Sequence, residues 1–213
     1  MHRHYSLFDK LFLTLDQAIR ALYHNPKTTG KSYPAQHVVE QTLTEKQRKH
    51  SAGLMRVNHA GEICAQALYH GQAAITLTSS VKEKMQQAAI EEGDHLIWCE
   101  KRLHELNSDT SYLNPLWYIG SFGIGMLASV AGDRWNLGFV AETEHQVISH
   151  LKKHLELLPE QDQRSYTILQ QMEKDEMKHR EEAIASGANE LPPLIKKAMA
   201  LASNLMVKTT YWI

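Results

Sequence analysis

Two Glu-x-x-His pairs constrain the fold of this chain more than any other feature of its sequence. The first pair is Glu92 with His95, and the second is Glu176 with His179. At this spacing on a helix, the two side chains lie on one face with their Cβ atoms roughly 5 to 6 Å apart, so that they can converge on one ion. Apolar periodicity predicts that each pair faces the interior, where an unpaired carboxylate would cost several kcal/mol. The pairs therefore predict buried helices with a polar centre.

A single glutamate precedes each pair at a similar distance. Glu62 stands 30 positions before Glu92, and Glu144 stands 32 positions before Glu176. The two pairs are 84 positions apart and the two single glutamates 82, so the two predicted hairpins resemble each other in where these residues stand. Four ionised carboxylates and two neutral imidazoles would reach zero formal charge with two divalent cations. Such a set is the pattern of ferritin-like di-iron and di-manganese centres.

Acidic residues stand directly before each pair, in the runs EEGDH and DEMKH. Glu91 and Asp175 are these residues. Each could accept a hydrogen bond from the ligand histidine of the opposite helix, as carboxylates behind metal-bound histidines often do. The alternative interpretation is that each of the two is a solvent-exposed carboxylate.

Helical periodicity runs through most of the chain and predicts an all-α fold. We expect a ferritin-like four-helix bundle with a hydrophobic crossover helix and additional N- and C-terminal helices. The expected organisation is an N-terminal helix and linker over residues 1–44, with the helix at about 5–24, and a ferritin-like domain over 45–213, within one globular unit. The four bundle helices are expected at about residues 45–77, 80–107, 133–158 and 159–187.

Local signals predict where these helices begin. Thr44 to Gln47 and Ser80 to Glu83 both have the form of a capping box. Asp133 is expected to cap the third bundle helix. Pro159 is expected to end that helix and to begin the next, because proline lacks the N–H that a helix interior needs but suits a first turn.

Composition excludes some functions. The net charge of −1 gives no electrostatic case for nucleic acid as a partner. The two cysteines, Cys64 and Cys99, form no CxxC pair, which argues against a disulfide framework and a thiolate zinc site. A reducing compartment is the simpler expectation.

Two apolar segments suggest contact with a membrane surface. Residues 110–132 contain no charged side chain but are short for a spanning helix of about 20 apolar residues. The tail, residues 191–213, combines an apolar helical face with lysines and a terminal Tyr-Trp pair that would suit a lipid interface. Packing of both segments against the bundle is the other physical interpretation.

Four stretches carry a resemblance to a known family: RVNHAGEICAQALYHGQ, EEGDHLIWCEKRLHEL, PLWYIGSFGIGMLASVAGDRWNLGFVAETEHQV and DEMKHREEA. They resemble the Coq7 (Cat5) family of demethoxyubiquinol hydroxylases, over about residues 45 to 213. The resemblance implies a di-iron monooxygenase of ubiquinone biosynthesis. Its metal ligands fall on the six residues that the spacing selects, which are Glu62, Glu92, His95, Glu144, Glu176 and His179.

The same resemblance implies a reaction and a setting. Two Fe ions, ferrous in the reduced state, would use O2 and an external reductant to hydroxylate the benzoquinol ring of a polyprenyl demethoxyubiquinol, which gives 3-demethylubiquinol. The expected partners are the polyprenyl quinol, the membrane surface and other proteins of ubiquinone biosynthesis. The expected location is peripheral, on the cytoplasmic side of a bacterial inner membrane.

The residues alone leave other functions open. Glutamate and histidine ligands suit iron, manganese or zinc. A ferritin-class ferroxidase or iron-storage protein, a di-manganese catalase, a rubrerythrin-like peroxidase and a lipid-binding bundle with a vestigial site all remain compatible with them. The apolar segments argue against a soluble cage, and the lack of a CxxC pair argues against the rubrerythrin type.

Overall fold

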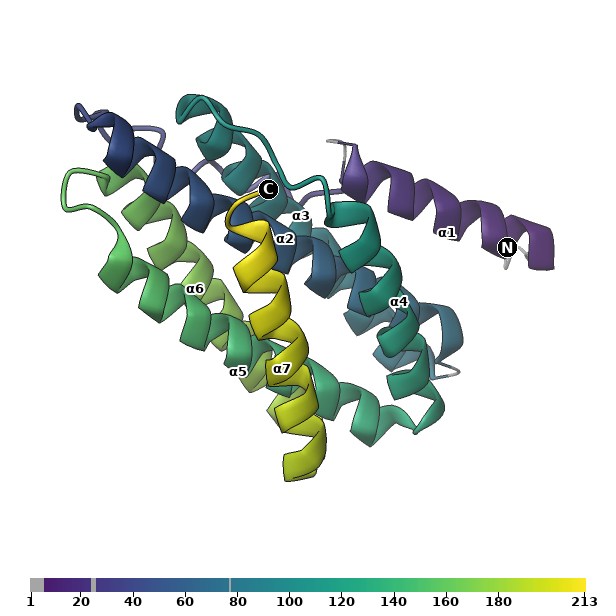
Figure 1. The fold of residues 1–213 in the computed structure, drawn as a ribbon. Coiled ribbons are helices and arrows are strands. Elements are labelled where there is room, and N and C mark those ends of the chain that lie inside the picture. Colours follow the sequence, from purple (N-terminus) through teal and green to yellow (C-terminus); the bar gives the residue numbers. More distant parts are fainter. Residues whose placement is uncertain (1–5, 24–25, 77) are drawn as a thin grey trace.

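The computed structural model describes residues 6–23, 26–76 and 78–213, and within them it contains α-helices and no β-strand (Figure 1). The all-α prediction is confirmed. The expected helix ends at residues 5, 24 and 77 fall outside the described residues. The helices are α1 (Leu7–Leu22), α2 (Glu45–Ile75), α3 (Ser79–Glu105), α4 (Asn114–Val130), α5 (Asp133–Leu157), α6 (Gln163–Ala185) and α7 (Pro193–Thr210).

Four long helices form the bundle as two hairpins. In one hairpin α2 packs on α3, and in the other α5 packs on α6, with further contacts between α2 and α5 and between α3 and α6. The crossover helix α4 lies along α2, and α7 packs against α2 and α5. The helix α1 contacts α2 and α4 and extends to the side of the bundle (Figure 1).

Capping explains the starts of α1 and α2. The backbone N–H of Thr44 donates to the side-chain oxygen of Gln47 at 2.9 Å, and the N–H of Gln47 donates back to the Thr44 hydroxyl at 3.3 Å. The expected capping box is therefore confirmed. Ser6 and Asp9 form a second capping box at the start of α1. Each box satisfies helix N–H groups that have no partner within the helix.

The start of α3 differs from the prediction. The capping box at Ser80 to Glu83 was wrong, because α3 begins at Ser79 and its N-cap residue Thr78 makes no capping hydrogen bond. The Thr78 hydroxyl instead donates to the carboxylate of Asp133, which also accepts from Thr76 at 3.0 Å. Asp133 is the first residue of α5 rather than its cap. Its carboxylate ties the turn after α2 to the start of α5.

The start of α6 also differs from the prediction. The helix begins at Gln163 rather than at Pro159. Asp162 is its N-cap, and one carboxylate oxygen accepts the backbone N–H of Ser165 at 3.0 Å. Aspartate is a strong capping residue because its oxygen satisfies an unpaired N–H of the first turn.

Close contact between α2 and α4 depends on two glycines. A Cβ atom on Gly71 would lie 2.2 Å from the carbonyl oxygen of Phe122, and one on Gly125 would lie 2.2 Å from that of Leu68. The two backbones therefore touch, which fixes the crossover helix against the bundle. Among the described residues, no helix combines the length and the apolar character that crossing a bilayer requires.

Two apolar clusters of the core lie along the bundle with the predicted ligands between them, and a third cluster joins residues of α1, α2, α3 and α4. One cluster includes Met55, Trp98 and Leu169, and the other includes Leu68, Met85 and Val140. On every bundle helix, the residues of the two clusters stand on opposite sides of the ligands in sequence. The polar centre thus has apolar packing at both ends, which shields it from solvent in those two directions.

Candidate metal centre

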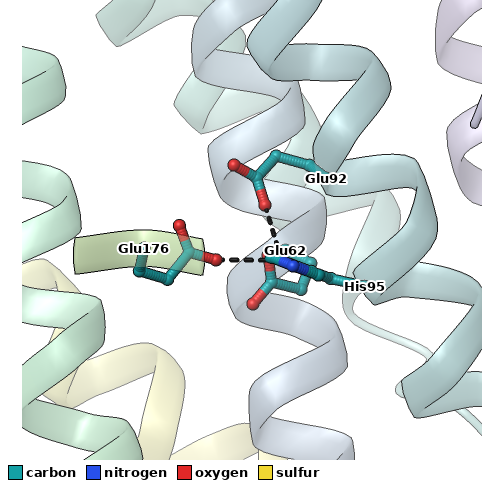
Figure 2. A group of neighbouring side chains, drawn as sticks. All are labelled: Glu62, Glu92, His95 and Glu176. Carbon is teal, nitrogen blue, oxygen red and sulfur yellow. Dashed lines mark hydrogen bonds and ion pairs between the residues drawn. The ribbon is translucent and has the colours of Figure 1, made fainter. Parts of the chain in front are cut away.

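The bundle brings the six predicted ligand residues together at its centre. Each of them is buried, with at most 6% of its surface exposed. Figure 2 shows four of them and places the His95 ring between the carboxylates of Glu92 and Glu176. The helix α2 contributes Glu62, α3 contributes Glu92 and His95, α5 contributes Glu144, and α6 contributes Glu176 and His179.

Their ligand atoms fall into two groups, each with the composition of a metal site. The atoms in each group lie within 4.8 Å of one another. Glu92 and Glu176 belong to both groups. The first group is Glu62, Glu92, His95 and Glu176, and the second is Glu92, Glu144, Glu176 and His179.

The two shared glutamates have the geometry of bridging ligands. Oε2 of Glu92 lies 3.1 Å from Nδ1 of His95, while its Oε1 lies 3.3 Å from Nδ1 of His179. Oε1 of Glu176 lies 2.9 Å from Nδ1 of His95, while its Oε2 lies 3.0 Å from Nδ1 of His179. Each carboxylate therefore presents one oxygen to either half of the centre.

Each histidine is oriented by a carboxylate on the opposite hairpin. Nε2 of His95 lies 3.2 Å from Oδ2 of Asp175, and Nε2 of His179 lies 2.7 Å from Oε2 of Glu91. Of the two interpretations that the sequence left open, the hydrogen bond to the opposite histidine is confirmed. A carboxylate only accepts, so Nε2 carries the proton and Nδ1 faces the centre.

The carboxylates outnumber the donors that face them. Glu62, at 3.6 Å, joins Glu92 and Glu176 around the single Nδ1 atom of His95. Neither carboxylate oxygen of the buried Glu144 accepts a hydrogen bond from any described residue. Such a deficit is costly in a dry interior, and two divalent cations would remove it. The residues therefore fit a pair of metal ions.

Comparison with known proteins shows the family of this chain. The family model described as ubiquinone biosynthesis protein COQ7 matches residues 49–210. The chain belongs to the COQ7 family. A relative in Acinetobacter baumannii is 54% identical over 211 residues, which is 99% of this chain and 100% of that protein. Relatives in Nitrosococcus oceani and Legionella pneumophila are 49% and 50% identical over 99% and 98% of this chain, and over 99% and 98% of their own lengths.

All three COQ7-family relatives carry the name 3-demethoxyubiquinol 3-hydroxylase. The family match covers α2 to α7, which includes every helix that supplies a candidate ligand. The resemblance predicted from the sequence motifs is confirmed at the level of the family. Buried groups of glutamate and histidine able to hold metal ions are present in this COQ7-family chain.

Electrostatics distinguish the groups within the centre. Burial raises the pKa of Glu62 and of Glu144 well above 4.5, and the negative charge of Glu176 raises both further. The hydrogen bond from His179 lowers the pKa of Glu91 to about 2. Burial acts to raise the pKa of Asp175, but the hydrogen bonds from His95 and Lys31 lower it to about 2. Glu91 and Asp175 are therefore ionised, whereas Glu62 and Glu144 resist ionisation.

The metal-free centre holds protons in place of cations. Burial alone would lower the pKa of His95, but the charge of Glu176 and the hydrogen bond to Asp175 raise it well above 6.5. Burial also acts to lower the pKa of His179, but the hydrogen bonds to Glu176 and Glu91 raise it. Metal ions bind the deprotonated Nδ1 atoms, so their binding would displace these protons.

An apolar cavity reaches the centre from one side. It has a volume of about 250 Å³ and lies among α2, α4, α5 and α7, and Glu62 is among its lining residues. Most of its lining is apolar, with polar atoms from side chains such as Thr143, Gln146 and His150. Cys64 also lines the cavity, while Cys99 is buried in the core. The sequence predicted neither the cavity nor its connection to Glu62, because its walls come from four separate helices.

Sequence reasoning also missed Lys31. Its Nζ atom lies 3.1 Å from Oδ2 of Asp175, the residue that holds His95. Lys31 belongs to the linker between α1 and α2, for which no contacts were predicted. No local spacing rule connects a lysine in an irregular linker with an aspartate on α6.

Proposed function

We propose that this chain is a 3-demethoxyubiquinol 3-hydroxylase, a monooxygenase that uses two iron ions and O2 to hydroxylate the ring of a polyprenyl quinol. The observation that carries the proposal is the pair of buried ligand groups sharing Glu92 and Glu176, in a chain of the COQ7 family. Relatives that bear this enzyme name match nearly the whole chain. The product would be 3-demethylubiquinol, an intermediate of ubiquinone biosynthesis.

Iron supplies the redox chemistry that this reaction needs. Two ferrous ions, when bound, supply two electrons for the reduction of O2, which zinc in the same ligands would not. One oxygen atom enters the ring and the other leaves as water, so an external donor must return two electrons in each cycle. The donor is a further partner of the proposed enzyme.

The protein's own residues hold and isolate the centre. Glu92 and Glu176 would bridge the two ions, because each presents an oxygen to either half. Glu62 and Glu144 would each bind one ion. The carboxylates of the opposite helices keep both histidines in the orientation that directs Nδ1 inward. The apolar clusters on both sides shield the centre from solvent in those two directions, which protects the oxygen chemistry from side reactions.

The apolar cavity is the proposed site for the quinol ring. A ring with a prenyl chain is largely apolar, and the lining of the cavity is mainly apolar as well. Gln146 and His150 provide polar atoms that can bind ring oxygens. Glu62 lines the same cavity, so a ring within it would lie beside the first ligand group.

Contact with a membrane surface is part of the proposal. Large apolar side chains are exposed on two of the four helices that line the cavity, namely Leu116, Ile119, Leu127 and Val130 on α4 and Leu194, Leu201 and Leu205 on α7. Exposed apolar helix faces of this kind are suited to burial at a lipid interface. A polyprenyl quinol resides in the bilayer, so this arrangement would let it enter the cavity directly. We place the enzyme at the periphery of a bacterial inner membrane, on the cytoplasmic side, where other proteins of ubiquinone biosynthesis would be its partners.

Metal loading and a quinol assay test the catalytic part. The protein, reconstituted with Fe2+ without oxygen, should bind two ions per chain and convert demethoxyubiquinol after addition of O2 and a reductant. Glu144→Ala and His179→Ala should each abolish turnover, whereas Glu83→Ala, an exposed change on α3, should not. Fewer than one bound ion per chain, or normal turnover by either ligand variant, would contradict the proposal.

Vesicle flotation tests the membrane part separately. The wild-type chain should float with phospholipid vesicles, and the double variant Leu127→Ser with Leu201→Ser should float less, because both side chains are exposed on the proposed surface. Ile184→Ser, an exposed apolar change on α6, is the matched control and should float like the wild type. Absence of wild-type flotation would refute membrane contact without affecting the metal centre.

A further inference from the structure

The two halves of the centre repeat each other beyond the ligands themselves. Nε2 of Gln87 donates to Oε1 of Glu91 at 2.9 Å. Nε2 of Gln171 donates to Oδ1 of Asp175 at 3.2 Å. Both glutamines lie four positions before the carboxylate that they bind, and 84 positions separate the corresponding residues. In each half, one carboxylate oxygen is thus bound by a glutamine and the other by a ligand histidine.

Lys31 breaks this repeat on one side. Its Nζ atom lies 3.1 Å from Oδ2 of Asp175, and the same oxygen accepts from Nε2 of His95 at 3.2 Å. Among the described residues, Glu91 has an ion pair with His179 and none with a lysine or arginine, and the distance from Glu91 to His179 is 2.7 Å. Lys178, which acts on Glu91 only through its charge, lies 3.5 Å from Glu182.

The linker that carries Lys31 is fixed to α3 beside the ligands. The backbone N–H groups of Thr29 and of the next residue both donate to the carboxylate of Asp94 at 3.2 Å, and the Thr29 hydroxyl donates to it as well. A Cβ atom on Gly93 would lie only 1.9 Å from the carbonyl oxygen of Lys27, so the linker backbone packs directly on α3. These contacts fix the linker backbone and so limit the positions that the Lys31 side chain can occupy.

We propose that Lys31 is a positioning residue that makes the two metal ions chemically unequal. A lysine that shares Oδ2 of Asp175 weakens this oxygen as an acceptor for His95. A histidine with a weaker carboxylate partner is a less basic metal ligand. The ion held by His95 is therefore poorer in electrons than the ion held by His179. The inference rests on the proposed pair of metal ions.

The ion that would be held by His95 is also the one nearer the apolar cavity. Glu62 belongs to the same ligand group as His95 and also lines the apolar cavity. Glu144, in the other group, is not among the cavity's lining residues. The ion that faces the proposed quinol site is thus the one that Lys31 makes the stronger Lewis acid.

Nuclear magnetic resonance of zinc-loaded protein tests the inference without any turnover. Zn2+ is diamagnetic, so in protein labelled with 15N-histidine the Nε2–H protons of His95 and His179 give sharp signals. Asp175→Asn and Glu91→Gln assign these signals, because each alters one hydrogen bond. Lys31→Met should move the His95 proton downfield, towards a stronger hydrogen bond, and leave that of His179 in place. Lys31→Arg, which keeps the charge, should resemble the wild type.

A control separates this effect from general loss of charge. Lys152→Met removes another lysine, one that lies 3.8 Å from Glu173 on α6, and should leave both signals unchanged. Lys31 itself is 42% exposed, so its replacement leaves no cavity in the core. A Lys31→Met spectrum in which neither signal moves, or in which both move alike, would overturn the inference.

Metal affinity provides a second measurement. Stepwise titration of the metal-free protein with Co2+, followed by visible absorption, should show tighter binding of one ion in Lys31→Met, by about two- to fivefold for a partly exposed pair. Unchanged constants for both steps would count against Lys31. Fewer than one bound ion per chain in the wild type would refute the metal centre itself. Two bound ions whose affinities do not change in Lys31→Met would refute only the inference about Lys31.

Discussion

Oε2 of Glu91 lies 2.7 Å from Nε2 of His179, although 88 positions separate the two residues. Loss of this carboxylate leaves the histidine without its orienting partner. Glu91→Ala should therefore weaken binding of one metal ion by about 10- to 100-fold. Titration of the metal-free protein measures this, with Glu83→Ala, an exposed change on the same helix, as the control. Equal affinities for Glu91→Ala and wild type would mean that the hydrogen bond does not support the ligand.

Glu144 destabilises the metal-free protein at neutral pH. Burial raises its pKa well above 4.5 in the folded state, so the stability associated with its proton is present below pH 4.5 and is lost as pH rises through the folded pKa. Glu144→Gln cannot ionise. Its advantage over the wild type in free energy of unfolding should grow from pH 5 upward, by at most about 1.4 kcal/mol per pH unit.

Urea unfolding in the presence of a chelator measures this difference between pH 5 and 8. The exposed change Glu156→Gln on the same helix is the matched control. With metal bound the order should reverse, because Glu144→Gln removes a ligand and with it part of the stabilisation by the ion. A pH-independent difference between Glu144→Gln and wild type would contradict the raised pKa.

Gly93→Ala should destabilise the protein and displace the linker. The added methyl group would lie 1.9 Å from the carbonyl oxygen of Lys27, which is backbone and cannot turn away. Forced contacts of this kind cost about 1 to 3 kcal/mol. Gly123→Ala is the control, since nothing lies within 4 Å of its Cβ position, and it should be neutral or stabilise α4 by up to about 1 kcal/mol. Thermal unfolding distinguishes the two, and equal melting temperatures would refute the close contact.

Arg102, in the last turn of α3, forms ion pairs with residues of the linker and of the start of α6. Its guanidinium is buried and lies 2.7 Å from the buried Asp162 and 2.6 Å from Glu40 of the linker. Arg102→Met should cost about 3 to 5 kcal/mol, because it leaves a buried carboxylate without its partner. Arg20→Met breaks an exposed pair on α1 and should cost less than about 0.5 kcal/mol. Urea unfolding gives both values, and a similarly small loss for Arg102→Met would be the contrary result.

Helical spacing made the six ligand residues predictable. Because a helix places positions i and i+3 on one face, Glu92 and His95 had to point the same way, and the matching offset of Glu176 and His179 identified the second site. The same logic selected Glu91 and Asp175 as candidate acceptors, but their exposure could not be judged from spacing. Packing of the hairpins against each other decided that question.

Contacts between segments that are far apart in the sequence could not be predicted from it. Lys31 and Asp175 are 144 positions apart, and no periodicity relates a linker to a helix face. The predicted cap at Asp133 failed for a similar reason, since its carboxylate binds threonine side chains from the turn after α2 instead of its own helix. Capping rules consider only neighbours in sequence, so they cannot anticipate such competition.

The matched hairpins have a consequence for how such a centre can be encoded. The hairpin of α2 and α3 and the hairpin of α5 and α6 supply matching ligand sets, because each provides one single glutamate, one glutamate of the shared pair and one histidine. A peptide of one hairpin, associated with a second copy of itself, would present the same ligands from two identical chains. A gene of half the length would then suffice for the centre. Only a fused chain, however, can place a residue such as Lys31 beside one histidine ligand and not beside the other.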